Sequence, residues 1–588
     1  MSPRFFYLSL FFSLLIGVAN LFVDVMEIDA AQYAEMSWEM LRTGQYLEPT
    51  CLGRPYLDKP PLLFWLSSLS FQLLGISNVA YKLPSLLFAI LAVYSVYRFA
   101  KIFYDENTAR LAALLLATSQ AMYMATNDVR TDTLLMGSVI FSIWQWAQFF
   151  ETSRNKNLLG GSIGTGLALL AKGPIGLIAV GAAVAPHVLW KRKWKQLLDW
   201  RFLSVLLIIV MMLIPMSVGL YRQHGLAGLR FYFWTQSFGR ITGESEWNNH
   251  PDTFFLLHTF AWMILPWTIF FFYGWIKSIA AIVRLRLASW ALREFMSLSG
   301  FSLVLVSLML SKYQLPHYVY VVLPLGCLLA AHALTQLSTQ QPALRWVTFL
   351  QGLISVAAIL GAVLLYTCFT PGSYGTLLAI ILVASAAAWV MLRGNTWLHY
   401  SVAPILAFNL LLSVFYFPAI LKYQAGNDMG RSIRQGGSEF ITFKYINNYS
   451  LVFYAQQMPA AEVWEADSLV SLLREKKKIT AVTTQEGLEL LTQRSIPYRV
   501  MLQKDDFPVS KMNLRFLHPL HRKEVVQRNY VVAFFFFFFF IFFFNFFFFF
   551  KKKIKKIFFF FFFFYFLKKK KFFFFIFFFF FFFFFCKF

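Results

Sequence analysis

The chain reads Met26-Glu27-Ile28-Asp29-Ala30-Ala31-Gln32-Tyr33-Ala34-Glu35, and then Arg54-Pro55-Tyr56-Leu57-Asp58-Lys59-Pro60-Pro61, in its first polar connection between apolar segments. Acids, cations and tyrosines are concentrated here in a chain that otherwise has long apolar runs. A charged side chain in or near hydrocarbon costs several kcal/mol, so such a cluster indicates a functional site at the membrane surface. An enzyme working at a bilayer face is our leading interpretation.

The composition excludes a soluble protein of this length, because 59% of the 588 residues are hydrophobic and only 14% are charged. Apolar windows of about 20 residues, each long enough to cross a bilayer, recur along the chain. We expect about 13 spans, the first a retained anchor and not a cleaved signal peptide. The expected spans are 5–22, 80–100, 109–126, 133–150, 157–171, 174–190, 202–220, 254–276, 296–311, 316–335, 346–369, 375–392 and 398–417.

The distribution of basic residues fits this count. Arg98, Lys101, Arg154 and the 191–195 basic cluster fall on one side, which the positive-inside rule assigns to the cytoplasm. The polar loops 23–79, 127–132, 221–253 and 312–315 fall on the other side, with everything after 418. Within loop 23–79, the apolar stretch 62–75 is short and follows two prolines, so an interfacial or re-entrant helix is expected there.

The chain changes character after the last span. Residues 420–533 have ordinary polar composition, and we expect a small soluble α/β domain on the same side as loop 23–79. Strand-like runs cover 440–443 and 450–454, and helix-like stretches cover 466–477 and 484–494. The segment contains no Gly-rich phosphate loop, which argues against a bound nucleotide.

Residues 534–588 form a low-complexity tail of Phe and Lys. Almost all of its residues can be encoded with A and T alone, so we interpret it as an A/T tract translated past the true end, with a membrane anchor as the alternative. Without the ten tail lysines, the net charge falls from +25 to +15. Cytoplasmic loops explain that excess, and nucleic-acid binding is not required. The four cysteines show no zinc or disulfide spacing.

Six short motifs occur in order along the expected outer connections. They are Asp29 with Tyr33-Ala34-Glu35, Pro55-Tyr56-x-Asp58-Lys59-Pro60-Pro61, Thr131-Asp132-x-Leu134-Leu135, Lys172-Gly173-Pro174, Phe238-Gly239-Arg240 and Ser311-Lys312-x-x-Leu315-Pro316-x-Tyr318. Together they resemble the GT-C superfamily of polyprenyl-phosphate-dependent glycosyltransferases. The resemblance covers about residues 1–420 and points to lipid A aminoarabinose transferases and protein O-mannosyltransferases. One departure is Gln32, where aminoarabinose transferases usually have Arg.

The resemblance implies a polytopic α-helical GT-C membrane domain at 1–419. It also implies inverting transfer of a sugar from a polyprenyl-phosphate donor to a lipid A, glycan or protein acceptor on the periplasmic face of a bacterial inner membrane. Asp29 would be the catalytic carboxylate, supported by Asp132. Asp58, with His250, would hold a divalent metal ion. The donor and its phosphate would contact a set of aromatic and basic residues: Tyr33, Tyr56, Lys59, Lys172, Arg240, Lys312 and Tyr318.

Each residue also has a structural interpretation. Asp29 and Asp132 could cap helices, Lys59 and Lys172 could extend to the membrane surface, and Asp58 could form a salt bridge with Lys59 or Arg54.

Two other classes of protein would also have many membrane spans. A transporter or flippase would place charges at mid-membrane and show repeated halves, whereas a non-catalytic scaffold would tolerate loss of Asp29.

Overall fold

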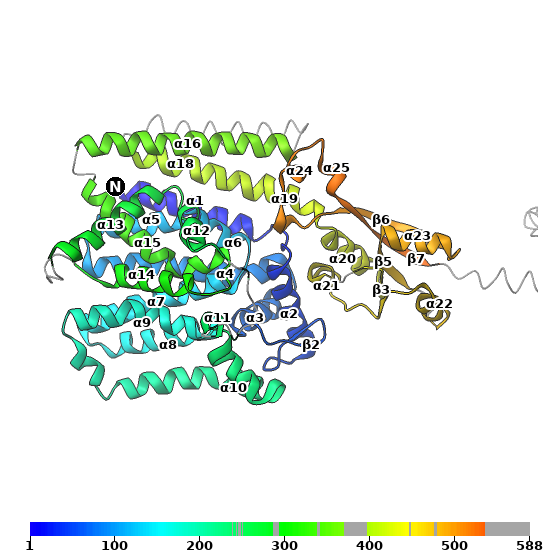
Figure 1. Cartoon of the computed structure of the whole chain (residues 1–588), viewed down its shortest axis with the longest axis horizontal. Coiled ribbons are helices and arrows are strands. Elements are labelled where there is room, and N and C mark those ends of the chain that lie inside the picture. The colour runs from blue at the N-terminus through cyan, green and yellow to red at the C-terminus, as the bar shows by residue number, and fades with distance from the viewer. Residues whose placement is uncertain are drawn as a thin grey trace, which may run out of the picture.

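The structure is a computed structural model. It describes residues 1–534 apart from 238, 243, 245–248, 250, 286–292, 338–340, 370–396, 446–447 and 476–478. The described part is a mostly helical bundle with a small C-terminal domain at one end (Figure 1). The expected span 375–392 and the Phe/Lys tail after residue 534 lie outside the described residues.

Six helices of the described part are long and apolar enough to cross a membrane. They are α1 (Pro3–Asn20), α4 (Asn78–Phe103), α10 (Phe202–Arg230) with η2 (Phe231–Thr235), η3 (Pro316–Val322) with α15 (Leu323–Leu337), α16 (Gln341–Phe369), and α18 (Trp397–Leu411) with η4 (Leu412–Tyr416), α19 (Phe417–Ile420) and η5 (Leu421–Tyr423). Four apolar helices are shorter, namely α3 (Leu62–Leu74), α9 (Pro174–Trp190), α13 (Thr268–Leu285) and α14 (Met296–Met309). A multi-span membrane protein is therefore confirmed, and the count of about 13 spans stays a prediction.

Two of the expected spans are not single helices. Segment 109–126 divides into α5 (Glu106–Ala117) and α6 (Gln120–Asn127), because the Ser119 hydroxyl caps the new helix by accepting from the Met122 N–H at 3.3 Å. Segment 254–276 divides into α12 (Phe255–Met263) and α13 around Pro266, which has no N–H to continue a helix. The remaining bundle elements are α7 (Thr131–Thr152), α8 (Asn155–Lys172), η1 (Trp194–Leu198) and α11 (Gly239–Thr242).

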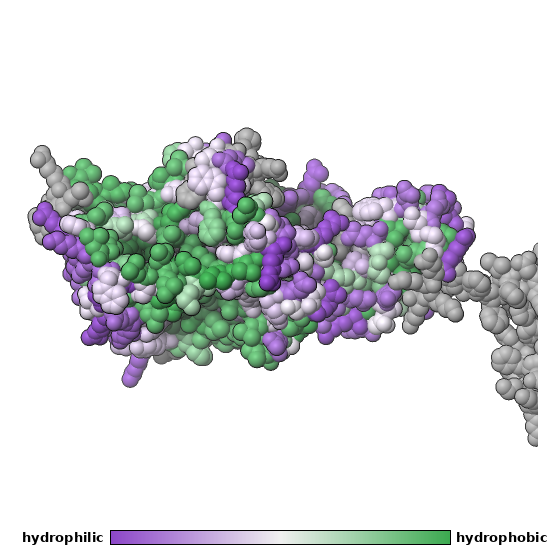
Figure 2. Space-filling view, turned by 90° about the horizontal axis from the view of Figure 1, so that it is seen from below, coloured by the Kyte–Doolittle hydropathy of each residue, from purple (hydrophilic) through white to green (hydrophobic). Residues whose placement is uncertain are grey.

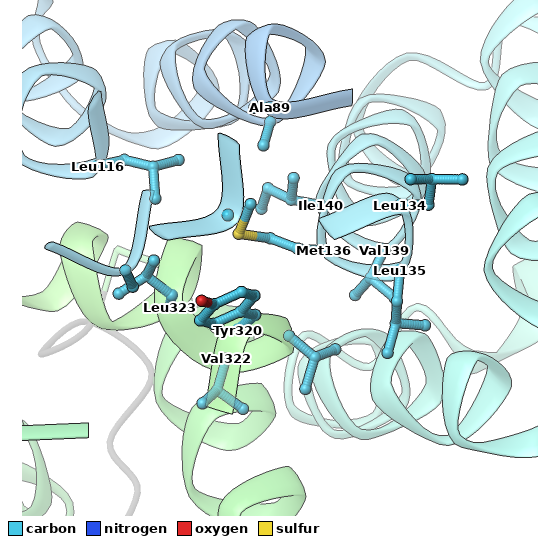
Figure 3. Close-up of a cluster of buried hydrophobic side chains, with 14 of the residues drawn as sticks. Ala89, Leu116, Leu134, Leu135, Met136, Val139, Ile140, Tyr320, Val322 and Leu323 are labelled. Atoms are coloured by element: carbon cyan, nitrogen blue, oxygen red, sulfur yellow. The ribbon is translucent and has the colours of Figure 1, made fainter. Parts of the chain in front are cut away.

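The middle of the bundle is apolar both inside and outside. Figure 2 shows hydrophobic side chains over the middle of this face, with hydrophilic ones at the far end of the bundle and over the C-terminal domain. In the interior, apolar side chains of α7, including Met136 and Ile140, are turned toward Tyr320 and Leu323 (Figure 3). These four side chains are at most 3% exposed. The buried contacts fix the start of α7, where site residues lie.

The first connection folds into a small unit at the bundle end beside the C-terminal domain (Figure 1). It contains α2 (Asp29–Thr43), a hairpin of β1 (Thr50–Cys51) and β2 (Arg54–Pro55), and then α3. Leu52 and Gly53, the two turn residues, have φ of 51° and 75°, as a tight two-residue hairpin turn requires. The hairpin leads the chain directly into Tyr56–Lys59.

The C-terminal domain contains a five-stranded mixed sheet in the order β4-β3-β5-β7-β6. The pairs β3–β4 and β3–β5 are parallel, while β5–β7 and β6–β7 are antiparallel. Its strands are β3 (Phe440–Phe443), β4 (Glu462–Val463), β5 (Thr480–Thr484), β6 (Tyr498–Asp506) and β7 (Gln527–Phe534). Its helices are α20 (Ala425–Gly436), α21 (Tyr449–Ala455), α22 (Ala466–Glu475) and α23 (Gln485–Gln493), with the short η6 (Val509–Lys511), α24 (Leu514–Leu517) and α25 (Arg522–Val525).

One strand prediction in this domain is wrong. Residues 450–454 lie in helix α21, which begins where the Asn448 side chain accepts a hydrogen bond from the Leu451 N–H at 2.9 Å. The apolar run that suggested a strand is buried against the first connection and α4 instead. Tyr454 accepts from the Val25 N–H at 2.8 Å, and the Phe453 ring lies 6.2 Å from the Tyr81 ring. Tertiary packing therefore outweighs the β-propensity of the run.

Candidate active site

Asp29 is the first residue of α2, where free N–H groups and the helix dipole favour a carboxylate. The Arg130 guanidinium donates from Nη1 to Asp29 Oδ2 and from Nε to Asp128 Oδ2, the latter at 2.8 Å. Burial alone would lower the pKa of Arg130, but the charges of Asp128 and Asp29 raise it on balance. Arg130 is thus a permanent cation that orients the Asp29 carboxylate.

Two tyrosines lie beside this carboxylate. Tyr33, one turn along α2, is 3% exposed, and its ring lies 5.6 Å from the Phe64 ring of α3. The Tyr56 ring lies 6.1 Å from Phe64 on the same helix. Burial raises the pKa of Tyr33, and the nearby Tyr56, Asp29 and Asp58 raise it further. Tyr33 therefore stays a neutral hydroxyl within the electrostatic influence of Asp29 and Asp58.

The Tyr56 hydroxyl is buried and forms no hydrogen bond with the described residues. Burial, followed by the charge of Asp58, raises the pKa of Tyr56, so this hydroxyl keeps its proton. A buried donor without a partner is rare in proteins and often marks the place of an absent ligand. The tyrosine is thus suited to donate to a substrate oxygen such as that of a phosphate.

Lys59 and Asp58 form an ion pair at the end of the same segment, with Lys59 Nζ 2.7 Å from Asp58 Oδ2. The Lys59 side chain is 13% exposed, so its charge lies in a mostly desolvated position. The Gln236 amide, just after η2, donates to the Asp58 backbone carbonyl. The 221–253 connection therefore helps to hold the Tyr56–Lys59 segment.

A second polar cluster lies at the start of α7, two residues after Arg130. Asp132 accepts from Lys172 Nζ through Oδ1, and His317 Nε2 lies 3.7 Å from its Oδ2. The Lys172 ammonium also lies 3.9 Å from the centre of the Tyr318 ring, a cation–π contact. Three connections expected on one face thus converge on one buried carboxylate.

The Lys172-Gly173-Pro174 motif has a clear local cause. Lys172 ends α8, where the helix dipole favours a cation, and Pro174 is the first residue of α9, where its missing N–H costs nothing. Gly173 between them has φ of +78°, which side chains disfavour. The sharp turn allows the two helices to pack together while Lys172 reaches Asp132.

Other predicted residues are not joined to these clusters. Lys312 is exposed, and its backbone carbonyl accepts from the Asn249 N–H at 3.3 Å. Arg240 lies in α11, but its side chain is outside the described part, as is His250 entirely. Among the described residues, no three His, Cys, Asp or Glu side chains are grouped to hold a metal, and the Asp58 carboxylate is paired with Lys59. The roles of Lys312, Arg240 and the Asp58–His250 metal pair stay predictions.

Sequence reasoning did not assign roles to several residues of these clusters. Arg130 lies in the polar loop 127–132, and His317 lies within the motif that ends in Tyr318, but the sequence does not indicate the partners of either residue. Glu35 and Glu39 were also missed. They are 0% and 2% exposed, and they accept from the Leu52 N–H at 3.3 Å and the Gly53 N–H at 3.2 Å. Their spacing of four residues, which places both on one helix face, was the available signal.

Comparison with known proteins confirms the resemblance. Residues 58–218 match the profile of the dolichyl-phosphate-mannose-protein mannosyltransferase family. An undecaprenyl phosphate-alpha-4-amino-4-deoxy-L-arabinose arabinosyl transferase of Pseudomonas paraeruginosa is 27% identical over 412 residues, which cover 67% of this chain and 72% of that protein. The protein of the same description from Edwardsiella ictaluri is 28% identical over 56% of this chain and 60% of its own length.

A solved structure has the same fold. The crystal structure of ArnT from Cupriavidus metallidurans bound to undecaprenyl phosphate superimposes with a TM-score of 0.68, at 18% identity. The superposition covers 91% of this chain and 98% of that one. The chain therefore has the fold of that ArnT structure, and both the bundle and the C-terminal domain fall within the shared fold.

Proposed function

We propose that this protein is a membrane glycosyltransferase that moves a sugar from a polyprenyl-phosphate donor to an acceptor. The position of Asp29 carries the proposal: a carboxylate at a helix N-terminus, oriented by Arg130, lies close to Tyr33, whose pKa also responds to Tyr56 and Asp58. The relatives named for undecaprenyl-phosphate aminoarabinose transfer support this donor class.

The proposed reaction is a single displacement with inversion at the anomeric carbon. An acceptor oxygen forms a bond to that carbon while its bond to the donor phosphate oxygen breaks, and the polyprenyl phosphate leaves with the bonding electrons. Asp29 accepts the proton of the acceptor hydroxyl or stabilises positive charge on the sugar ring. Because Arg130 holds this carboxylate from one side, its other oxygen is free to face the substrate.

The leaving phosphate gains negative charge as the bond breaks. Lys59 can exchange its Asp58 partner for a phosphate oxygen, and the Tyr56 hydroxyl, which has no hydrogen-bond partner among the described residues, can donate to another. Interactions that strengthen as charge develops lower the barrier of the chemical step. Lys172, Arg240, Lys312 and Tyr318 complete the proposed donor site, with Asp132 fixing the position of Lys172.

The finer assignments belong to the same proposal. The acceptor is a lipid A, glycan or protein group on the periplasmic face of a bacterial inner membrane, about 13 helices cross that membrane, and residues 420–533 form a periplasmic domain. Gln32, which donates to the Tyr449 hydroxyl at 3.1 Å, leaves the donor sugar open. Metal binding by Asp58 and His250 is tested by metal titration, and no step above involves a metal.

Transfer of radiolabelled sugar from membrane polyprenyl-phosphate donors tests the function directly. Wild type and Asp29→Asn are compared at matched expression. We expect label to reach an acceptor with wild type alone, and the labelled product identifies that acceptor. Equal transfer by both proteins would remove Asp29 from the mechanism. No transfer by either protein across a broad donor panel would favour the flippase or scaffold alternatives.

A further inference from the structure

We propose that residues 509–524, the anchor segment between β6 and β7, form a membrane-surface anchor that inserts Leu514 and Leu520 among anionic phospholipid headgroups. The segment belongs to the C-terminal domain, yet its contacts are with the ends of membrane-crossing helices. The proposal does not depend on the catalytic activity.

The start of the anchor segment packs against membrane-crossing helices. Val509 is 2% exposed and lies in one apolar cluster with Ile16 of α1 and with Leu412 and Phe417 of the α18–α19 span. A few residues later, the Tyr416 hydroxyl contacts Met512 Sδ at 3.4 Å. The segment therefore lies across the ends of these spans on the side of the first connection.

Aromatic rings continue this contact. The Phe516 ring lies 5.9 Å from the ring of Phe369, the last residue of α16, and 5.2 Å from the ring of Tyr423 at the end of the α18–η5 span. On its other side it stacks on Phe507 at 4.0 Å. Phe516 thus fills the space between two span ends and the C-terminal domain.

Arg522 binds the end of the anchor segment to the C-terminal end of α16. Its Nη2 donates to the Cys368 carbonyl at 2.7 Å, and its guanidinium lies 4.3 Å from the centre of the Phe369 ring. The Cys368 carbonyl belongs to the last turn of α16, where carbonyls have no partner within the helix. Because Arg522 is only 9% exposed and also donates to the Phe516 carbonyl at 2.8 Å, the segment is held in one conformation.

Two leucines project from this fixed segment into solvent. Leu514 is 84% exposed and Leu520 is 80% exposed, more than any other large hydrophobic side chain of the described residues. Isolated exposed leucines are common, but these two flank residues that contact the ends of two spans. That position is the level at which headgroups surround the bundle. In Figure 1, α24 and α25 lie beside the end of α16.

The positive charge of the anchor segment indicates that it binds anionic lipids. Lys511, Arg515 and Lys523 are exposed on the same segment, and Glu524 is its one acidic residue. Apolar side chains interleaved with cations are typical of elements that lie in the headgroup layer of anionic membranes. The geometry therefore favours a phospholipid surface over a protein partner as the occupant.

Quenching of a site-specific fluorophore tests this placement. The full chain, with its four native cysteines replaced by alanine and with an unfolding temperature in detergent equal to that of wild type, receives one cysteine at Leu514→Cys or Leu520→Cys and is labelled with a small environment-sensitive dye. The matched control is Val500→Cys on β6, a residue that is 42% exposed. Val500 lies seven residues before Phe507, roughly 20 Å away along an extended strand. Each protein is placed in nanodiscs containing phosphatidylglycerol or only phosphatidylcholine.

We expect headgroup-labelled nitroxide lipid to quench the dyes at 514 and 520 at least about twofold more than the dye at 500, with iodide showing the opposite order. The excess lipid quenching of the dyes at 514 and 520 over the dye at 500 should be larger in phosphatidylglycerol nanodiscs. It should be smaller in the Lys511→Gln/Arg515→Gln/Lys523→Gln variant. If iodide quenches the dyes at 514 and 520 as much as the dye at 500, the proposal is overturned. Protection from both quenchers would also overturn it, by indicating a protein partner. Equal lipid quenching in both nanodisc types would overturn the requirement for anionic lipid.

Discussion

Arg130 donates a hydrogen bond to the carboxylate of Asp29 and so joins two connections that are 101 residues apart in the sequence. The same guanidinium holds Asp128, whose other oxygen, Oδ1, is buried and has no hydrogen-bond partner among the described residues. One cation thus serves two carboxylates, and Asp29, the more exposed of the two, is the one positioned to face a substrate.

Replacing Arg130 should lower kcat as well as stability, because Arg130 also pairs with the buried Asp128 carboxylate. In Arg130→Gln the Asp29 carboxylate loses its charged donor and can rotate away from the substrate. A charge-assisted hydrogen bond contributes about 1.5–3 kcal/mol, so we expect kcat for sugar transfer to fall by roughly ten- to a hundredfold. Arg110→Gln is the matched control, because Arg110 pairs with Glu106 in a helical i,i+4 contact apart from both clusters. An unchanged kcat in Arg130→Gln would show that Asp29 needs no cation.

The Asp132–Lys172 pair should behave as a buried ion pair. The two side chains are 4% and 11% exposed, so removing one partner leaves an uncompensated charge. We expect Lys172→Met to lower the free energy of unfolding by roughly 3–5 kcal/mol, and Asp132→Asn/Lys172→Met to recover most of that loss. Thermal unfolding in detergent measures the stability of each variant.

Sugar transfer distinguishes a catalytic from a purely structural pair. Because Lys172 is proposed to contact the donor, the double variant should stay inactive although it is folded. A double variant that regains transfer together with stability would restrict the pair to a structural role.

The structure shows contacts at the site that the sequence could not predict. Ordered motifs, with hydropathy and charge alternation, predict that Asp29, Tyr56, Lys59 and Asp132 lie on one side of the membrane, and this placement stays a prediction. The partner of Asp29 could not be predicted, because an ion pair between distant connections depends on how the helices pack. Residues 450–454 show the same limit, since their β-like composition is overridden by burial against the first connection.

Glu35 should act through the hairpin that precedes Tyr56. Burial, followed by the charge of neighbouring Glu39, raises the pKa of Glu35 well above its usual value, which favours its neutral form. Glu35→Gln mimics the neutral carboxyl and keeps an acceptor for the Leu52 N–H, and we expect little change. Glu35→Ala removes the acceptor and should cost about 1–3 kcal/mol of stability.

Donor kinetics separate this positioning role from a general loss of folding. A displaced hairpin moves Tyr56 and Lys59, which are proposed to stabilise the leaving phosphate, so Glu35→Ala should lower kcat more than Glu35→Gln does. Measurement at a temperature where both variants are folded makes the comparison valid. Equal kinetic defects in Glu35→Gln and Glu35→Ala would contradict the role of Glu35 as the acceptor for the Leu52 N–H.

Docking of the C-terminal domain onto the first connection should weaken as pH rises. Glu27 lies in this interface and accepts from the Ser450 N–H at 2.6 Å. Burial raises its pKa to about 7 from a usual value of 4.5, and the charges of Asp506 and Asp29 add to the shift. Because the folded state holds the proton more tightly than the unfolded chain, the stabilising contribution is complete below pH 4.5. It declines as pH rises and is lost above about pH 7.

Glu27→Gln isolates this effect. The amide keeps an acceptor for Ser450 but does not titrate, so the variant should show a smaller loss of protection at pH 8 relative to pH 5 than wild type. Hydrogen exchange of residues 449–455, corrected for intrinsic rates, measures that protection. Asp506, whose pKa is also raised by burial, contributes a slope of the same sign in both proteins, so their difference reports Glu27 and its interaction with Asp506. Glu489→Gln, at an exposed position of α23, is the control and should match wild type. If Glu27→Gln leaves the pH dependence of this protection unchanged, the titrating group lies elsewhere in the interface.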